Sequence, residues 1–349
     1  MRRALVIGNG AAGTFSSWLL ARKGWKVTLV GRGTPSTAMS TGCLRSEPKT
    51  FHAEISEFLS NDHMHWATGN LYGISRIGTS FRCCWSPSHS TWKEGEAPGN
   101  IAVVGLEGHP SLQARLASAM INGRGMKAEP FIMPGSIPPD VPLGSWFRSD
   151  EAWEALAKEL GDLSADAILL PAFVPLQDYG RLDQLERRCG RRVLEAISPL
   201  GSPGQRLTDL MLERAKEVGA TVWDGRKVAS LDVQNDVVRG VTVIGGLESR
   251  NITVDAMVVA TGGPLVDGLL LDGRKIADPY KLFRVVRDVN ALKGGYDNRG
   301  GRLVANDGQV MTNAVAAGDC LGSEGRESGS GLTEALESAC LAVKALEER

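Results

Sequence analysis

Apolar and polar positions follow a regular pattern at the start of the chain. Residues 4–7 form a short apolar run that ends at a glycine. Apolar positions then recur every three or four residues as far as Leu19, and a second apolar run follows at residues 26–30. This order predicts a strand, a glycine turn, a helix and a second strand. A dinucleotide-binding unit begins in the same way.

Regular alternation returns after residue 203. Apolar positions from Leu207 to Val218 recur at helical spacing, and Gly219 ends that helix. A last helix is predicted from Leu332 to Leu346, where one face is apolar. Between these two helices the pattern predicts strands at 221–223, 227–233, 237–244, 250–254 and 256–260.

The middle of the chain has a different pattern and contains all five histidines, at positions 52, 63, 65, 89 and 109. It predicts strands at 101–105 and 165–170 and helices at 111–121 and 150–160. We therefore predict an α/β protein with a Rossmann-like, three-layer FAD/NAD(P)-binding fold and an inserted α/β domain. The predicted dinucleotide-binding domain is discontinuous (1–50, 200–265 and 300–349), and the inserted domain comprises 51–199 and 266–299.

Charge and composition narrow the function. Lysine and arginine number 39 against 40 aspartates and glutamates, a formal net charge of -1. No basic field is therefore available for nucleic acid or for an anionic membrane. Glycine supplies 42 of the 349 residues, about 12% against a usual share of about 7%, which implies many close backbone approaches.

The first glycine turn has the pattern G-x-G-x-x-G in the setting where that pattern has a physical reason. Gly8 permits the sharp turn out of the strand, Gly10 lets the backbone approach a pyrophosphate, and Gly13 allows helix and strand to pack closely. The helix start at Ala11 and Ala12 then directs backbone N–H groups toward the phosphates.

The second strand ends without the acidic residue that usually holds the adenosine ribose. The sequence there is Val30-Gly31-Arg32-Gly33. Arg32 is a candidate to pair with a phosphate or to lie over an adenine, and it also suits the 2′-phosphate of NADP. These interpretations stay open, and we count Arg32 and Gly33 among the cofactor-binding positions.

Two distant segments favour a flavin. Ala260-Thr261-Gly262 resembles the strand-end turn that passes beside the first glycine turn in flavoproteins with two dinucleotide-binding domains, and Gly318-Asp319 resembles their closing motif. The resemblance implies that Asp319 holds a ribityl hydroxyl and that the helix start at Gly331 and Leu332 faces the flavin ring. Val228 is a further predicted contact.

A polar loop, Ser40-Thr41-Gly42-Cys43, follows the second strand, where such flavoproteins place a loop against the isoalloxazine. Cys43 and Cys320 are then either a dithiol relay or two residues packed against the cofactor. The histidines are interpreted singly as surface or core residues, and no metal site is predicted because His63 and His65 lack a third ligand.

The six cysteines have no C-x-x-C spacing, and the start of the sequence shows no signal peptide. We expect a reducing, cytoplasmic setting. No apolar stretch reaches the roughly 20 residues that cross a bilayer, so any contact with the inner face of the membrane is expected through a partner. Trp66, Trp85, Trp92 and Trp146 are candidate aromatic anchors for such a partner.

Four longer segments, at 40–44, 103–108, 169–173 and above all 198–207, resemble the smaller flavoprotein subunit of anaerobic glycerol-3-phosphate dehydrogenase. That resemblance implies a flavoprotein subunit that oxidises sn-glycerol 3-phosphate to dihydroxyacetone phosphate. It also implies a larger flavin subunit and an iron–sulfur subunit as partners, with a quinone as acceptor. The fold favours FAD, and FMN is the alternative. Cys43 stands where the family more often has serine.

Arg206, near the start of a helix, is the candidate ligand for the substrate phosphate, and Cys43 is the other candidate for a part in the chemistry. Equally, Arg206 pairs with an acid such as Asp209. Two other functions stay open: a non-catalytic flavin-binding or interface subunit of a redox complex, and a stand-alone soluble flavin-dependent dehydrogenase. No second glycine turn for NADP follows residue 50, which counts against the latter.

Overall fold

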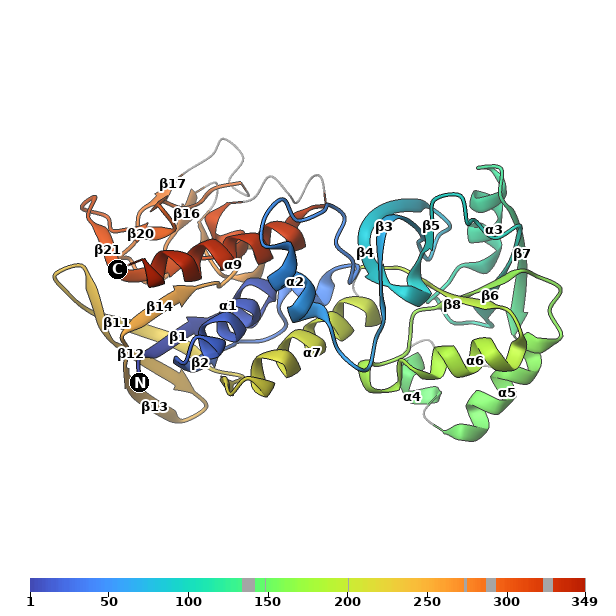
Figure 1. Cartoon of the computed structure of the whole chain (residues 1–349), viewed down its shortest axis with the longest axis horizontal. Coiled ribbons are helices and arrows are strands. Elements are labelled where there is room, and N and C mark those ends of the chain that lie inside the picture. The colour runs from blue at the N-terminus through green and yellow to red at the C-terminus, as the bar shows by residue number, and fades with distance from the viewer. Residues whose placement is uncertain are drawn as a thin grey trace. The chain divides into compact units, whose positions relative to one another are not determined.

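The computed structural model describes residues 1–133, 142–147, 149–199, 201–272, 275–286, 293–322 and 329–348. The chain divides into two compact units (Figure 1). Unit 1 consists of Met1–Thr37, Pro48–Leu59 and Thr208–Arg349, and unit 2 of Ala38–Glu47 and Ser60–Leu207.

Unit 1 is built on a sheet that has seven strands among the described residues, in the order β10-β2-β1-β14-β21-β20-β19. The first five are parallel, and β20 and β19 are antiparallel. Ala4–Ile7 pair in register with Ala256–Val259, and all eight residues are buried, as in parallel strands covered on both faces. The strands are β1 (Arg3–Ile7), β2 (Lys26–Val30), β10 (Thr221–Trp223), β14 (Ala256–Val259), β19 (Asn298–Arg299), β20 (Arg302–Val304) and β21 (Val310–Ala316).

Helices cover one face of this sheet and a second sheet covers the other. Helix α1 (Ala11–Arg22) contacts α9 (Gly331–Glu347), and α2 (His52–Leu59) places Phe58 4.6 Å from Phe15, between ring centroids. Leu5 and Met257 share a core with residues of the antiparallel meander β11 (Lys227–Gln234), β12 (Val237–Gly245) and β13 (Glu248–Thr253). The predicted three-layer α/β fold is confirmed.

The two units differ from the predicted domains in four places. Residues 266–299, predicted in the inserted domain, belong to unit 1 because Ile276, Phe283 and Tyr296 are buried in its core. Residues 51–59 also belong to unit 1, whereas 38–47 and 201–207, predicted in the dinucleotide-binding domain, belong to unit 2. Among the described residues, 266–299 contain two antiparallel strand pairs. The first is β15 (Leu270–Asp272) with β16 (Lys275–Ala277), and the second is β17 (Val285–Val286) with β18 (Gly295–Tyr296).

Unit 2 contains a parallel sheet in the order β7-β6-β8-β9 and an antiparallel sheet in the order β4-β3-β5. The predicted strands and helices are found, and the helix predicted from residue 111 begins at Ala114. The elements are β3 (Trp66–Ile74), β4 (Ser80–Pro87), β5 (Trp92–Lys93), β6 (Asn100–Leu106), α3 (Ala114–Asn122), β7 (Lys127–Met133), α4 (Leu143–Trp146), α5 (Asp150–Gly161), β8 (Ala167–Pro171), α6 (Arg181–Cys189) and β9 (Arg192–Ala196). Helix α7 (Ser202–Glu217) crosses the division at Leu207.

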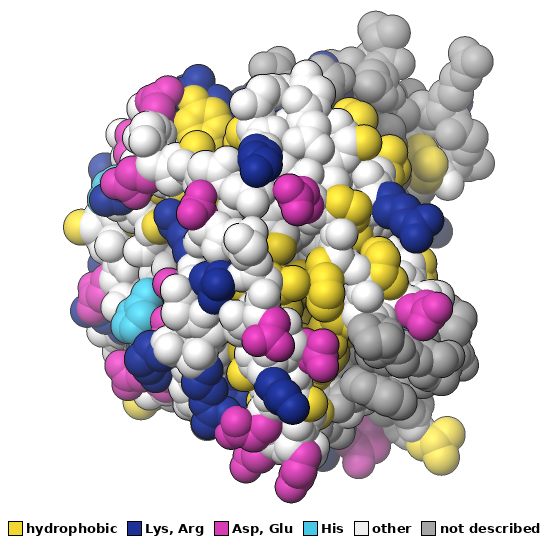
Figure 2. Space-filling model, turned by 90° about the vertical axis from the view of Figure 1, so that its right-hand side faces the viewer, with side chains coloured by type: hydrophobic (Ala, Val, Ile, Leu, Met, Phe, Trp, Pro, Cys, Tyr) yellow, Lys and Arg dark blue, Asp and Glu magenta, His cyan; other side chains and the backbone are white. Residues whose placement is uncertain are grey.

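Charges of both signs are mixed on the surface. On the face shown in Figure 2, Lys and Arg side chains lie between Asp and Glu side chains, and neither sign forms a continuous field. Among the described residues, no helix is long and apolar enough to cross a membrane.

Candidate functional site

The turn after β1 is closely packed at two of its three glycines. A Cβ atom on Gly13 would lie 1.8 Å from the carbonyl oxygen of Gly8, and one on Gly8 would lie 2.0 Å from the carbonyl oxygen of Ala260. Gly8 also has a φ of +114°, which side chains disfavour. These two glycines are therefore required by contacts within the protein itself.

No close contact with another described residue explains the glycine at position 10. Its φ of -79° is open to any residue, and the nearest atom to a Cβ there would be Thr37 Oγ1 at 3.4 Å, an ordinary contact. Among the described residues, nothing requires a glycine at this position. A ligand that approaches the start of α1 would require one, and a pyrophosphate binds in this way in dinucleotide-binding folds. The turn fits the predicted cofactor.

Thr37 is a site residue that the sequence analysis missed. The backbone N–H of Ala11 donates to Thr37 Oγ1 at 2.9 Å, and Thr37 is buried. The hydroxyl thus satisfies a donor of the first turn of α1, where the cap residue Gly10 has no side chain to do so. The available signal was the hydroxyl-rich run Thr34-Pro35-Ser36-Thr37 after the second strand.

The second predicted turn lies beside the first, at the carboxyl ends of adjacent strands β1 and β14. The contact between Gly8 and Ala260 joins them, and Gly262 has a φ of +80°. Thr261 Oγ1 donates to the carbonyl of Gly268 at 3.1 Å, which holds the turn in place. Ligands of open α/β sheets bind at this edge.

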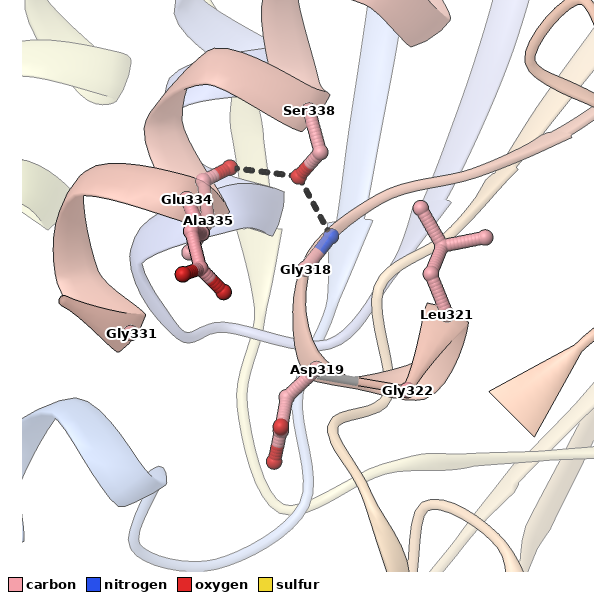
Figure 3. Close-up of a pocket in the computed structure, with 8 residues that line it drawn as sticks. All are labelled: Gly318, Asp319, Leu321, Gly322, Gly331, Glu334, Ala335 and Ser338. Atoms are coloured by element: carbon pink, nitrogen blue, oxygen red, sulfur yellow. Dashed lines mark hydrogen bonds between the residues drawn. The ribbon is translucent and has the colours of Figure 1, made fainter. Parts of the chain in front are cut away.

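The closing motif completes the same edge. A Cβ on Gly318 would lie 2.8 Å from Ala12 Cβ, and the Gly318 N–H donates to Ser338 Oγ at 2.8 Å, so this residue lies against both α1 and α9. Figure 3 shows Asp319 next to it, with its carboxylate directed away from α9. The pocket here is lined by Gly318, Asp319, Leu321, Gly322, Gly331, Glu334, Ala335 and Ser338.

The start of α9 borders this pocket. Ser330 precedes the helix without capping it, and its hydroxyl instead donates to Glu334 Oε1 at 2.7 Å. Backbone N–H groups at a helix start carry partial positive charge. The predicted positions Gly331 and Leu332 therefore lie where a negatively charged ring edge would be stabilised.

The other predicted cofactor positions in unit 1 lie near the end of β2. Arg32 is exposed, and Gly33 has a φ of +68°. Val228 pairs with Val243 in the meander and is 8% exposed, so its side chain belongs mainly to the core. Contacts of these residues with a cofactor remain predictions.

The sequence matches the family described as FAD dependent oxidoreductase over residues 3–293. The chain belongs to the FAD-dependent oxidoreductase family. Its cofactor is FAD, and the expected class of flavoprotein oxidoreductase is confirmed. The residues around Gly10, Thr261 and Asp319 are the candidates to hold the FAD.

The solved structures that the chain matches are distant from it in sequence. The 3-ketosteroid-delta4-(5alpha)-dehydrogenase from Rhodococcus jostii RHA1 is 10% identical, with 100% of this chain and 97% of that chain covered and a TM-score of 0.44. A geranylgeranyl bacteriochlorophyll reductase-like protein from Thermoplasma acidophilum is 11% identical, with coverage of 99% and 79% and a TM-score of 0.39. A search of curated proteins gives no match.

The polar loop Ser40-Thr41-Gly42-Cys43 belongs to unit 2, where it lies against the first turn of α7. A Cβ on Gly42 would lie 2.5 Å from the carbonyl oxygen of Pro203, and one on Gly204 would lie 2.5 Å from that of Ala38. Two glycines thus permit a close backbone contact between segments far apart in the sequence. The predicted contact of this loop with the isoalloxazine remains a prediction.

The surroundings of Arg206 contradict its predicted role as the ligand of the substrate phosphate. Its guanidinium is 1% exposed and donates to Glu195 Oε2 at 2.6 Å and to the carbonyl of Val174 at 2.9 Å. It also lies 4.5 Å above the ring of Tyr179. The residue pairs with an acid, as the alternative interpretation stated, but the acid is Glu195 on β9 because this face of α7 points into unit 2.

His89 is a buried core residue with acidic partners. Its Nε2 lies 2.9 Å from Asp183 Oδ1, and its Nδ1 lies 3.0 Å from the carbonyl oxygen of Val193 and 3.3 Å from Glu186 Oε2. Burial alone would lower the pKa of His89, but these hydrogen bonds outweigh it and raise the pKa to about 9. The core interpretation is confirmed for this histidine.

The predicted role as an exposed interface anchor is wrong for two of the tryptophans. Trp85 is 2% and Trp92 5% exposed, because they lie on strands whose side chains fill unit 2. Trp66 is half-buried, and the side chain of Trp146 lies outside those described.

Cys320 is likewise buried, and its thiol donates to the carbonyls of Val259 and Ala317. Burial raises the pKa of Cys320 to about 12, which favours packing over thiolate chemistry at this residue.

Proposed function

We propose that this FAD-dependent oxidoreductase is a flavoprotein subunit that oxidises sn-glycerol 3-phosphate to dihydroxyacetone phosphate. In this proposal electrons pass through a larger flavin subunit and an iron–sulfur subunit to a quinone. The observation that carries the proposal is the segment 198–207, which resembles the smaller flavoprotein subunit of anaerobic glycerol-3-phosphate dehydrogenase. Gly204 of that segment has a structural reason, the close contact with Ala38, so the resemblance includes a residue that the fold requires.

The chain's own residues have distinct parts in this proposal. FAD, when bound, supplies the acceptor for the two electrons of alcohol oxidation. The first turn of α1, with Gly10 and the N–H of Ala11 that donates to Thr37 Oγ1, would hold the pyrophosphate. The Asp319 carboxylate would accept a hydrogen bond from a ribityl hydroxyl, and the start of α9 would stabilise negative charge on the flavin ring.

A second candidate is a non-catalytic flavin-binding subunit of the same kind of redox complex. The burial of Arg206 favours it, because the residue first considered for the substrate phosphate is engaged by Glu195. In either case we place the chain in the cytoplasm, at the inner face of the membrane only when a partner brings it there.

The decisive experiment compares three preparations: the chain alone, the chain co-expressed with candidate flavin and iron–sulfur partners, and the same complex with Gly10→Ala in this chain. We expect glycerol 3-phosphate-dependent quinone reduction only with the partners, and a loss of at least about tenfold with Gly10→Ala at subsaturating FAD. Flavin content per chain is measured on each preparation.

The outcomes separate the two candidates. If the Gly10→Ala complex loses the flavin of this chain but keeps full quinone reduction, the substrate is oxidised in the partner and the non-catalytic candidate holds. If the isolated chain reduces quinone as fast as the complex, the subunit proposal is wrong.

A further inference from the structure

Cys43 and Cys83 come together in the interior of unit 2. The segment around Cys43 pairs with β4: the Leu44 N–H donates to the carbonyl of Trp85 at 2.9 Å, and the Cys84 N–H donates to the carbonyl of Leu44 at 2.8 Å. This pairing brings Cys43 into one buried cluster with Cys83, Leu71 and Ile197. Both thiols are free, and their residues are 1% and 2% exposed.

The surroundings of the two thiols differ. Cys43 Sγ lies 3.3 Å from Ser86 Oγ and 3.4 Å from the carbonyl oxygen of Thr41. A hydrogen bond from Cys83 lowers the pKa of Cys43 against the effect of burial, and Ser86 and the positive charge of Arg206 lower it further. The same hydrogen bond and burial raise the pKa of Cys83 well above its usual range. Cys43 is thus the thiol that ionises more readily of the two.

The other cysteines lack this environment. Burial raises the pKa of both Cys320 and Cys340 to about 12. Burial also raises the pKa of Cys189 and of Cys84, whose thiol donates to the carbonyl of Arg45 at 3.5 Å. A reactive thiolate needs nearby donors or positive charge, and among the described cysteines these outweigh the effect of burial on the pKa only at Cys43.

We propose that Cys43 and Cys83 are a redox-active dithiol, which hydrogen peroxide converts into a disulfide within unit 2. The burial of both thiols restricts the oxidant to a small molecule, and the contact between them makes Cys83 the resolving partner. The proposal does not rest on the substrate proposed above.

The chemistry balances with peroxide as the two-electron oxidant. The Cys43 thiolate attacks one peroxide oxygen, the O–O bond breaks, and hydroxide leaves as the sulfur becomes a sulfenic acid. The Cys83 sulfur then attacks the Cys43 sulfur, the S–O bond breaks, and a second hydroxide leaves. The Cys83 proton converts one hydroxide into water, and a proton from the solvent converts the other hydroxide into water.

The test uses the full chain, purified reduced and titrated with hydrogen peroxide. At each step free thiols are alkylated under denaturing conditions, and the peptides are mapped by mass spectrometry. We expect a linked pair of peptides containing Cys43 and Cys83, lighter by two hydrogen atoms and restored by dithiothreitol. It should appear before Cys189, Cys320 or Cys340 is modified. Modification of any of these three first, or a Cys83–Cys84 link, would overturn the proposal.

Two variants assign the roles, with Cys84→Ser as the matched control on the neighbouring residue. Cys83→Ala removes the resolving thiol, so Cys43 should accumulate as sulfinic acid, whereas Cys43→Ser should leave Cys83 unoxidised over the same titration. Cys84→Ser should form the link as the native chain does. If Cys83 is oxidised equally fast in Cys43→Ser, Cys43 is not the attacking thiol and the proposal fails. The peptide map of the native chain tests the proposal even if a variant does not fold.

Discussion

At the scale of one residue, the glycines of the first turn separate stability from binding. Gly10→Ala should leave the midpoint of thermal unfolding unchanged, because its Cβ meets nothing closer than 3.4 Å. The same change should weaken FAD binding by about tenfold or more, about 1.4 kcal/mol, since the methyl group occupies the pyrophosphate's approach. Fluorescence titration of apo-protein measures the affinity, and circular dichroism measures the unfolding.

Gly13→Ala is the matched contrast, because its Cβ would lie 1.8 Å from the Gly8 carbonyl oxygen. It should lower the unfolding midpoint of the apo-protein itself. Should Gly10→Ala bind FAD as tightly as the native chain, the start of α1 would have to be withdrawn as the pyrophosphate site.

His89 predicts a pH dependence of stability. Its pKa is raised from 6.5 to about 9 in the folded chain, so the protonated form is favoured by folding. The stabilisation is complete below pH 6.5 and is lost as the pH rises toward about 9. The facing groups are Asp183 and Glu186 on α6, and the pKa of Glu186 is lowered despite its burial by the hydrogen bond from His89.

Urea midpoints measured at pH 6 and at pH 9.5 test this prediction. The native chain should lose stability between them, and His89→Gln should lose less. His65→Gln, at an exposed position, should behave as the native chain does. An equal loss in His89→Gln and in the native chain would mean that His89 does not carry the dependence.

At the scale of elements, the contact between the start of α7 and the loop 38–42 makes a prediction. Gly204→Ala would place a Cβ 2.5 Å from the Ala38 carbonyl oxygen and 2.7 Å from that of Ser40, so backbone must shift. Such overpacking costs about 1–3 kcal/mol of unfolding free energy. Gly201→Ala, whose nearest neighbour would be 3.6 Å away, is the control and should cost little. Equal urea midpoints for the two variants would contradict the close contact.

Sequence patterns predicted the helices and strands better than they predicted which of these pack or pair together. The turns around Gly8, Thr261 and Gly318 were predicted to lie together because the last two resemble segments that meet the first glycine turn in flavoproteins with two dinucleotide-binding domains. The stretch with Ile276, Phe283 and Tyr296 was assigned to the wrong domain, since its core residues have no regular spacing. The partner of Arg206 was also missed, because a pair between β9 and α7 forms only when the chain folds.

At the scale of the whole molecule, the division into two units predicts which part of the chain FAD binding stabilises. The glycine turn, the turn at Thr261 and the closing motif all belong to unit 1. A ligand at a hundred times its dissociation constant stabilises the unit that binds it by about 2.7 kcal/mol. Hydrogen exchange that requires unfolding of unit 1 should therefore slow by about a hundredfold when FAD is added.

Exchange measured by mass spectrometry on the apo and FAD-loaded chain resolves the two units. We expect the largest protection at 8–13, 259–262 and 317–322, and less in β6 and β8 of unit 2. Protection at 40–43 as well would support the predicted contact of that loop with the isoalloxazine. Equal protection in both units would mean that they unfold together, whereas protection confined to unit 2 would move the FAD site out of unit 1. Only uneven protection, centred on the three turns, agrees with a site built at the carboxyl edge of the β1–β14–β21 sheet.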